Sequence, residues 1–219
     1  MRVLFGPEGP LAAAFEGFRQ REGQIRMAEA VSGVIARRGG LAVEGGTGIG
    51  KTFAYLVPAI QALRAEGLRV MVSTYTRNLQ DQLVKKDLPR LHAALGGGFD
   101  WAVLKGRGNY LSKRRLQRAL ESEGDLYGEK GLSAFTQWVA STSSGDVGEL
   151  RGAVDPSLWS KVESHRDHCL AQRCPAHGEC FFFNARREAQ GAGLLVVNHA
   201  VFLSHLALGK ETLPEPDIL

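Results

Sequence analysis

Apolar and polar positions repeat along the chain with two different periods, which predict helices and strands in turn. Residues 24–38 place apolar side chains three and four positions apart, as an amphipathic helix does, and Gly39-Gly40 ends the pattern. Short apolar runs predict four buried strands, at residues 41–43, 69–73, 101–104 and 194–197. Helices are expected at 51–66, with a kink at Pro58, and at 77–95. Strands that alternate with helices favour an α/β fold with a parallel sheet.

The strand pattern stops after residue 104 and resumes after residue 190. Residues 105–190 contain no buried-strand run, but they hold every cysteine of the chain and a basic segment. We therefore expect a discontinuous α/β domain formed by residues 1–104 and 191–219. A separate, mainly helical insertion is expected at residues 105–190.

Composition favours a folded protein in a reducing compartment. The chain has 219 residues, of which 44% are apolar, and its 27 glycines show no collagen-like period. No run approaches the roughly 20 apolar residues of a membrane span, and the first residues lack a signal-peptide core, so we expect a cytoplasmic protein without membrane contact. The three cysteines all lie between Cys169 and Cys180, which indicates a metal site rather than a disulfide framework.

Positive charge is concentrated in one segment. The net charge is only +4, but Lys105–Arg118 holds six basic residues and no acidic one. Such a stripe is typical of nucleic-acid binding, and an interleaved Tyr110 offers a stacking surface. The expected DNA contacts in this segment are Lys105, Arg107, Tyr110, Lys113, Arg114 and Arg115. The alternative is a solvated face without a ligand.

One motif carries nucleotide chemistry. Gly45-Gly46-Thr47-Gly48-Ile49-Gly50-Lys51-Thr52 satisfies the pattern G-x-x-x-x-G-K-[ST] between an expected strand and an expected helix. In such a loop the backbone amides surround phosphates, Lys51 reaches the β- and γ-phosphates, and Thr52 offers its hydroxyl to Mg²⁺. The sequence therefore predicts a site for ATP and Mg²⁺.

Four further segments occur with this loop in a characteristic order. They are Arg21–Met27, Ser73–Leu83, Leu104–Leu111 and Leu195–Ala200. In this order they resemble the DinG/XPD-type DNA helicases of superfamily 2, the iron–sulfur helicases, and the bacterial DinG-like members most closely. The resemblance covers essentially the whole chain and implies the RecA-like P-loop NTPase fold, with the chain corresponding to the N-terminal portion of such a helicase.

The resemblance also implies roles for polar residues outside the loop. Gln24, with Arg21, would read the adenine edge, the alternative being an exposed helix start. Thr74, Thr76 and Asn78 would bind DNA backbone phosphates, and simple capping of the next helix is compatible with that role.

The cysteines resemble the last three ligands of the family's 4Fe-4S cluster. They are Cys169, Cys174 and Cys180, and the first ligand position is occupied by Ser112. Ser112 is either a replacement that weakens or removes the cluster or a poor oxygen ligand. The three cysteines could instead hold a cluster with an open iron, bind zinc as a Cys3His site with His168 or His177, or remain reduced thiols.

By resemblance, the function is that of an ATP-dependent 5′-to-3′ DNA helicase in DNA repair or replication, acting as a monomer on single-stranded or forked DNA. The family's acidic box would follow Leu219, so we expect this chain alone to hydrolyse ATP poorly. A P-loop small-molecule kinase and a metal-stapled DNA-binding module without turnover are the two competing functions.

Overall fold

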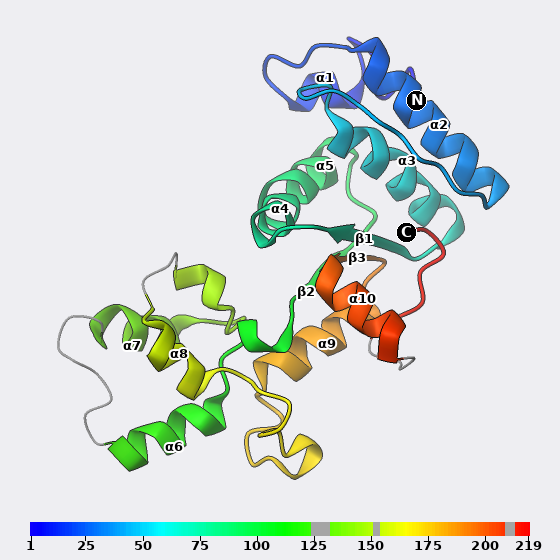
Figure 1. Cartoon of the computed structure of the whole chain (residues 1–219). Helices are drawn as coiled ribbons and strands as arrows, with labels where there is room; N and C mark the ends of the chain where they lie inside the picture. Colours follow the sequence, from blue (N-terminus) through cyan, green and yellow to red (C-terminus); the bar gives the residue numbers. More distant parts are fainter. Residues whose placement is uncertain (124–131, 151–153, 209–212) are drawn as a thin grey trace. The chain divides into compact units, whose positions relative to one another are not determined.

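The computed structural model describes residues 1–123, 132–150, 154–208 and 213–219 (Figure 1). The chain divides into two compact units. Unit 1 comprises Met1–Val103 and Gly191–Leu219, and unit 2 comprises Leu104–Gln190. Within the described ranges, no helix is both long and apolar enough to cross a membrane.

Unit 1 is built on a three-stranded sheet with the strand order β1-β3-β2. The strands are β1 (Val70–Thr74), β2 (Trp101–Leu104) and β3 (Leu194–Asn198). β1 and β3 run parallel, in a register that places Val70 opposite Leu194 and Thr74 opposite Asn198. Four consecutive residues of β3 are buried, as a central strand covered on both faces requires. The predicted α/β class with a parallel sheet is confirmed.

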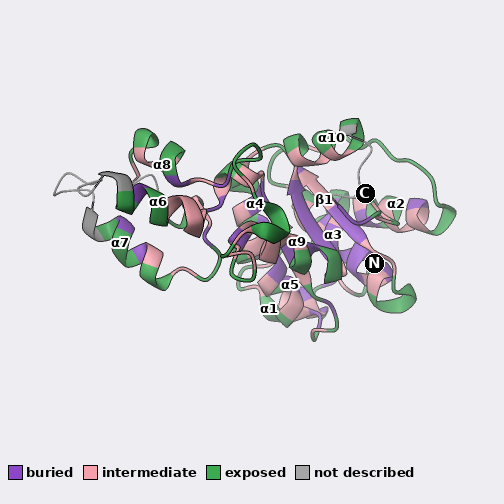
Figure 2. Cartoon of the chain, turned by 90° about the horizontal axis from the view of Figure 1, so that it is seen from below, coloured by how far each residue is buried: buried purple, intermediate pink, exposed green. Residues whose placement is uncertain are grey.

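Six helices of unit 1 are described around this sheet. They are α1 (Pro10–Ala14), α2 (Glu22–Arg37), α3 (Lys51–Glu66), α4 (Arg77–Gln82), α5 (Leu88–Ala94) and α10 (His199–Leu208). The helix expected at 77–95 is interrupted, since a π-helical turn over Leu83–Asp87 separates α4 from α5. α2 packs along α3, and α1 packs against α5. Ile25, Leu56 and Ile60 are fully buried in the core of this unit, and Figure 2 shows the buried residues along β1.

The strand expected at residues 41–43 does not form, which corrects that part of the sequence analysis. Leu41 and Val43 are 44% and 43% exposed, and they line a cavity of about 630 Å³ together with residues of β1. A strand needs a partner for its backbone groups, and the nearby edge of β1 is paired at Val70 with Ile218. The apolar run is therefore present without the neighbour that would make it a strand.

Unit 2 is mainly helical in its described residues. Its helices are α6 (Lys113–Glu123), α7 (Leu132–Ser141), α8 (Pro156–Val162) and α9 (Phe181–Gly191), which runs into unit 1 at its last residue. Isolated antiparallel bridges join Tyr110 to Asp146 and Leu111 to Glu163. α6 packs against α8, whose first turn is capped by the carboxylate of Asp155.

Candidate nucleotide-binding site

The glycine-rich loop lies directly before α3, and its backbone bends where glycine is required. Gly48 and Gly50 have φ values of 78° and 82°, in the left-handed region that L side chains rarely adopt. Gly50 is also crowded, because a Cβ at this position would lie 2.1 Å from Nε2 of Gln24. The left-handed backbone at 50 therefore requires glycine, whereas the end of the Gln24 side chain could shift away from a Cβ.

Lys51, the first residue of α3, folds its side chain back over the loop. Its ammonium donates to the carbonyl oxygens of Gly45 at 2.7 Å and of Gly46 at 3.1 Å. The residue is exposed, so its amine lies at the surface of the loop rather than in the core. A phosphate bound in the loop would offer this amine a fully charged acceptor in place of two neutral carbonyls, and charge-assisted hydrogen bonds are the stronger kind.

Arg21 and Gln24 both contact the loop from α2 and the residue before it. Gln24 is 4% exposed, and its Nε2 donates to the carbonyl oxygen of Gly50 at 2.9 Å. A guanidinium nitrogen of Arg21 donates to the carbonyl oxygen of Gly48. These side chains hold two carbonyls of the loop, and Gln24 uses one N–H of its amide to do so. Of the exposed helix start given as the alternative, Arg21 is indeed exposed, whereas Gln24 is buried.

Thr52 is half-buried and shares a hydrogen bond with Tyr55, a residue that sequence reasoning missed. Burial raises the pKa of Tyr55 to about 12, and the Thr52 hydrogen bond works in the opposite direction. Tyr55 lies one helical turn after Thr52, and that spacing was the available sequence signal. Its hydroxyl stays neutral and positions the Thr52 side chain at the mouth of the loop.

The residues after β1 form a compact turn. Thr74 is 8% exposed, and its hydroxyl donates to the carbonyl oxygen of Thr76 at 3.2 Å. Thr76 caps α4, because its Oγ1 accepts from the backbone N–H of Leu79 at 3.2 Å. Asn78 is exposed on the first turn of that helix. The capping interpretation thus holds for Thr76, and the Thr74 hydroxyl is already engaged within the turn.

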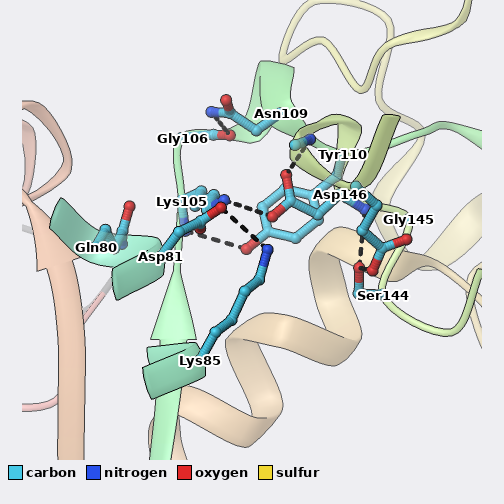
Figure 3. Close-up of polar contacts among 12 residues, drawn as sticks. Gln80, Asp81, Lys85, Lys105, Gly106, Asn109, Tyr110, Ser144, Gly145 and Asp146 are labelled. Atoms are coloured by element: carbon cyan, nitrogen blue, oxygen red, sulfur yellow. Dashed lines mark hydrogen bonds and ion pairs between the residues drawn. The ribbon is translucent and has the colours of Figure 1, made fainter. Parts of the chain in front are cut away.

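Two of the expected DNA contacts are buried inside unit 2. Lys105 is 2% exposed, and its ammonium forms an ion pair with Oδ2 of Asp146 at 2.5 Å (Figure 3). Tyr110 is 3% exposed, and its hydroxyl accepts from the backbone N–H of Lys105 at 3.0 Å. Burial raises the pKa of Tyr110 above its ordinary value. A buried ring cannot stack on a base and a buried amine cannot reach a phosphate, so the structure corrects both assignments.

Four other basic side chains of this segment make contacts within unit 2. Arg107 lies over the ring of Phe182, 4.0 Å from its centre, and Lys113 pairs with Glu179 at 2.6 Å. The guanidinium of Arg114 donates to the carbonyl oxygen of His168. That of Arg115 donates to the carbonyl oxygens of residues 160 and 161 at 2.7 and 2.9 Å. These contacts fix the segment that leads to the cysteines, and they give the basic residues a structural role of their own.

The three cysteines and Ser112 line one small cavity of about 30 Å³ in unit 2, together with His165, His168 and His177. Ser112 also accepts a hydrogen bond at Oγ from the backbone N–H of Arg115, as a residue capping α6 does. In the described part of the chain, no three His, Cys, Asp or Glu side chains form a set able to hold a metal ion. The cavity has room for one or two water-sized groups, and its donors do not fit a four-iron cluster as they stand.

Comparisons with known proteins agree with the assignment of the glycine-rich loop as a nucleotide-binding loop. The sequence model of the DEAD/DEAH box helicases matches residues 23–118. The chain is 39% identical over 222 residues to the ATP-dependent DNA helicase YoaA of Escherichia coli strain K12, covering 98% of this chain and 34% of that protein. It is 35% identical over 229 residues to the ATP-dependent helicase DinG of Mycobacterium tuberculosis strain H37Rv, covering 95% and 34%. It is 31% identical over 212 residues to the 3′-5′ exonuclease DinG of Bacillus subtilis strain 168, covering 96% and 23%. The chain spans about a third of the length of the first two relatives.

Proposed function

The chain is homologous to the DinG-type ATP-dependent helicases, and we propose that it is the N-terminal, ATP-binding portion of a DNA helicase of this kind. The single observation that carries the proposal is the loop before α3. It combines two positive-φ glycines, an exposed lysine at the helix start and a neighbouring threonine, which is the arrangement that phosphates and Mg²⁺ require. Residues 45–52 would bind the phosphates, with Lys51 and Thr52 contacting the γ-phosphate and the metal ion.

Arg21 and Gln24 would act through the loop in this proposal. Both side chains already hold loop carbonyls, so they would keep the backbone amides turned toward the phosphates. The bond to Gly50 uses one N–H of the Gln24 amide, so adenine recognition would use the second N–H and Oε1 of the same amide. The test is the Gln24→Ala variant: loss of selectivity for ATP over GTP indicates base reading, and equal weakening for both nucleotides indicates support of the loop.

The decisive experiment measures Mg²⁺–ATP binding to the 219-residue chain by titration calorimetry. Lys51→Ala should weaken binding at least about tenfold, because a hydrogen bond to a charged group is worth roughly 1.5–3 kcal/mol. Lys85→Ala is the matched control, since Lys85 belongs to the same unit and its ammonium pairs with Asp81 at 3.0 Å (Figure 3). Unchanged affinity in the Lys51 variant would refute the proposed site.

We propose that DNA binding uses the exposed or half-buried polar residues of both units. In unit 1 these are Thr76 and Asn78 after β1, with Thr74 supporting their turn. In unit 2 they are Arg107, Lys113, Arg114 and Arg115, without Lys105 and Tyr110. Positive side chains release counterions from the DNA backbone, so the basic residues of unit 2 would bind without sequence preference. Single-stranded or forked DNA as the substrate, 5′-to-3′ movement, a monomeric state and a cytoplasmic location belong to the same proposal.

We propose that residues 1–104 and 191–219 form the RecA-like motor lobe and that residues 105–190 form an insertion within it. The insertion would carry a metal centre held by Cys169, Cys174 and Cys180. Their shared cavity supports this assignment, but the side chains would have to move together to form a ligand set. Iron, zinc and acid-labile sulfide analysis of the purified chain tests it. Protein free of all three, after anaerobic preparation with iron and sulfide supplied, would overturn it.

A further inference from the structure

Tyr75 is a large aromatic residue that the fold leaves in water. Its side chain follows the last residue of β1 and is 81% exposed, whereas Thr74 before it is buried. In open parallel α/β sheets, ligands bind beyond the carboxyl ends of the strands, which is where Tyr75 lies. An aromatic ring exposed at this edge is a ready contact for a flat ligand.

The ring of His199 lies next to the ring of Tyr75. The two ring centres are 6.1 Å apart, with their planes inclined by 51°. His199 begins α10 after β3, and its Nδ1 is hydrogen-bonded to Oγ of Ser73 at 2.7 Å. The neighbouring strands β1 and β3 thus fix His199, and His199 limits the positions open to the tyrosine ring.

The backbone around Tyr75 is fixed as well. The Thr74 hydroxyl donates to the carbonyl oxygen of Thr76, which bridges the residues on either side of the tyrosine. Thr76 then caps α4. The backbone that carries the tyrosine is therefore fixed on both sides of the residue, and less backbone ordering on binding favours affinity.

We propose that Tyr75 is a stacking platform for a base of single-stranded DNA, with His199 as the residue that positions its ring. The inference rests on the proposed DNA-binding function and names one contact within it. The chemistry of the surroundings favours a nucleotide over an apolar partner: Asn78, exposed on the first turn of α4, provides an amide for a backbone phosphate. Every base has a π-face, so such a contact is tolerant of sequence.

The test is fluorescence anisotropy of the whole chain with two labelled oligonucleotides of about 16 residues, the upper end of single-strand site sizes. One is oligothymidylate and the other has the same backbone with abasic sites in place of the bases. Tyr75→Ala should weaken binding to oligothymidylate about fivefold or more, the lower end of base–aromatic stacking, and should leave binding to the abasic strand within about twofold. Tyr75→Phe keeps the ring and should bind both strands as the parent does.

Val3→Ala is the matched control, because Val3 is 82% exposed in the same unit and its loss removes apolar surface without removing a ring. Thermal unfolding of each variant checks that the fold is retained. His199→Ala should reproduce part of the loss on oligothymidylate and none on the abasic strand. Equal weakening of both strands by Tyr75→Ala, or no weakening of either, would overturn the stacking role while leaving DNA binding intact. Failure of the parent chain to bind either strand would overturn the DNA-binding proposal and the stacking role with it.

Discussion

Lys51 and Lys105 both read as phosphate-binding lysines in the sequence, yet the structure places them in opposite environments. Lys51 is exposed at the end of a glycine-rich loop, and its ammonium donates to two neutral carbonyls of that loop. Lys105 is 2% exposed and paired with Asp146. The difference shows that a motif which fixes the backbone conformation can also keep its lysine exposed to a ligand. A count of basic residues says nothing about which of them the fold has already used.

The buried pair gives the largest expected effect. Asp146→Ala should lower the free energy of unfolding by about 1.5–3 kcal/mol, because it removes a charge-assisted hydrogen bond from the buried Lys105 ammonium. Urea unfolding followed by tryptophan fluorescence measures the change, since Trp138 and Trp159 both belong to unit 2. The double variant Lys105→Met/Asp146→Leu should recover much of the loss, because it removes both charges. A loss below about 1 kcal/mol in the single variant would mean that the pair behaves as a surface pair.

Gly50→Ala should have the next largest effect. The left-handed backbone of Gly50 and the 2.1 Å approach of Gln24 Nε2 both oppose a Cβ, so unit 1 should lose about 1–3 kcal/mol of stability. Gly46→Ala is the matched control in the same loop, because a Cβ there meets no atom within 4 Å. Thermal or urea unfolding of the two variants distinguishes them. Equal stability of both would show that the loop is not held in this conformation.

Charge removal in the basic segment should change the salt dependence of DNA binding. Lys113, Arg114 and Arg115, replaced together by glutamine, should reduce the slope of log K against log salt by about 2 for single-stranded DNA. The measurement is anisotropy at several salt concentrations. Each of the three side chains also makes contacts within unit 2, so a stability measurement must accompany it. An unchanged slope in a folded variant would assign the segment a purely structural role.

The exposed pair between Lys113 and Glu179 gives the smallest expected effect. The Lys113 hydrogen bond and charge lower the pKa of Glu179. Any stabilisation is therefore present above the pKa that Glu179 has in the unfolded chain, and it is lost as pH falls through the lower folded value. Glu179→Gln should cause only a small change in the free energy of unfolding at neutral pH, and urea unfolding in acid should show no change. A neutral-pH loss comparable to that of Asp146→Ala would contradict the contrast between buried and exposed pairs.

Those parts of the fold that depend on local pattern could be predicted. The strands near 70–74, 101–104 and 194–198 show as apolar runs, and the run is most fully buried in β3, the central strand of the sheet. The loop before α3 could be predicted from its glycines and its lysine, because Gly48 and Gly50 adopt backbone conformations that favour glycine. The strand expected at residues 41–43 does not form, and the sequence could not show this. An apolar run becomes a strand only when a neighbouring strand pairs with it.

Side-chain partners distant in sequence could not be predicted. The residues around Lys105 give no indication of its contact with Asp146, which lies 41 positions away. The residues around Tyr75 likewise give no indication of its contact with His199. The contact of Gln24 with Gly50 is of the same kind, because it depends on how α2 packs along α3. Long-range packing therefore decides which polar residues remain available, and sequence reasoning erred where it assumed exposure.

Hydrogen–deuterium exchange with and without Mg²⁺–ATP tests the central claim that the glycine-rich loop is the nucleotide site. The amides of residues 45–54 should exchange more slowly in the presence of nucleotide, because they would donate to the phosphates. Residues 165–180 of unit 2 should be unaffected, and Lys51→Ala should abolish the protection at the same nucleotide concentration. Saturating nucleotide that protects other residues but leaves 45–54 unchanged, or equal protection in the Lys51 variant, would contradict the account.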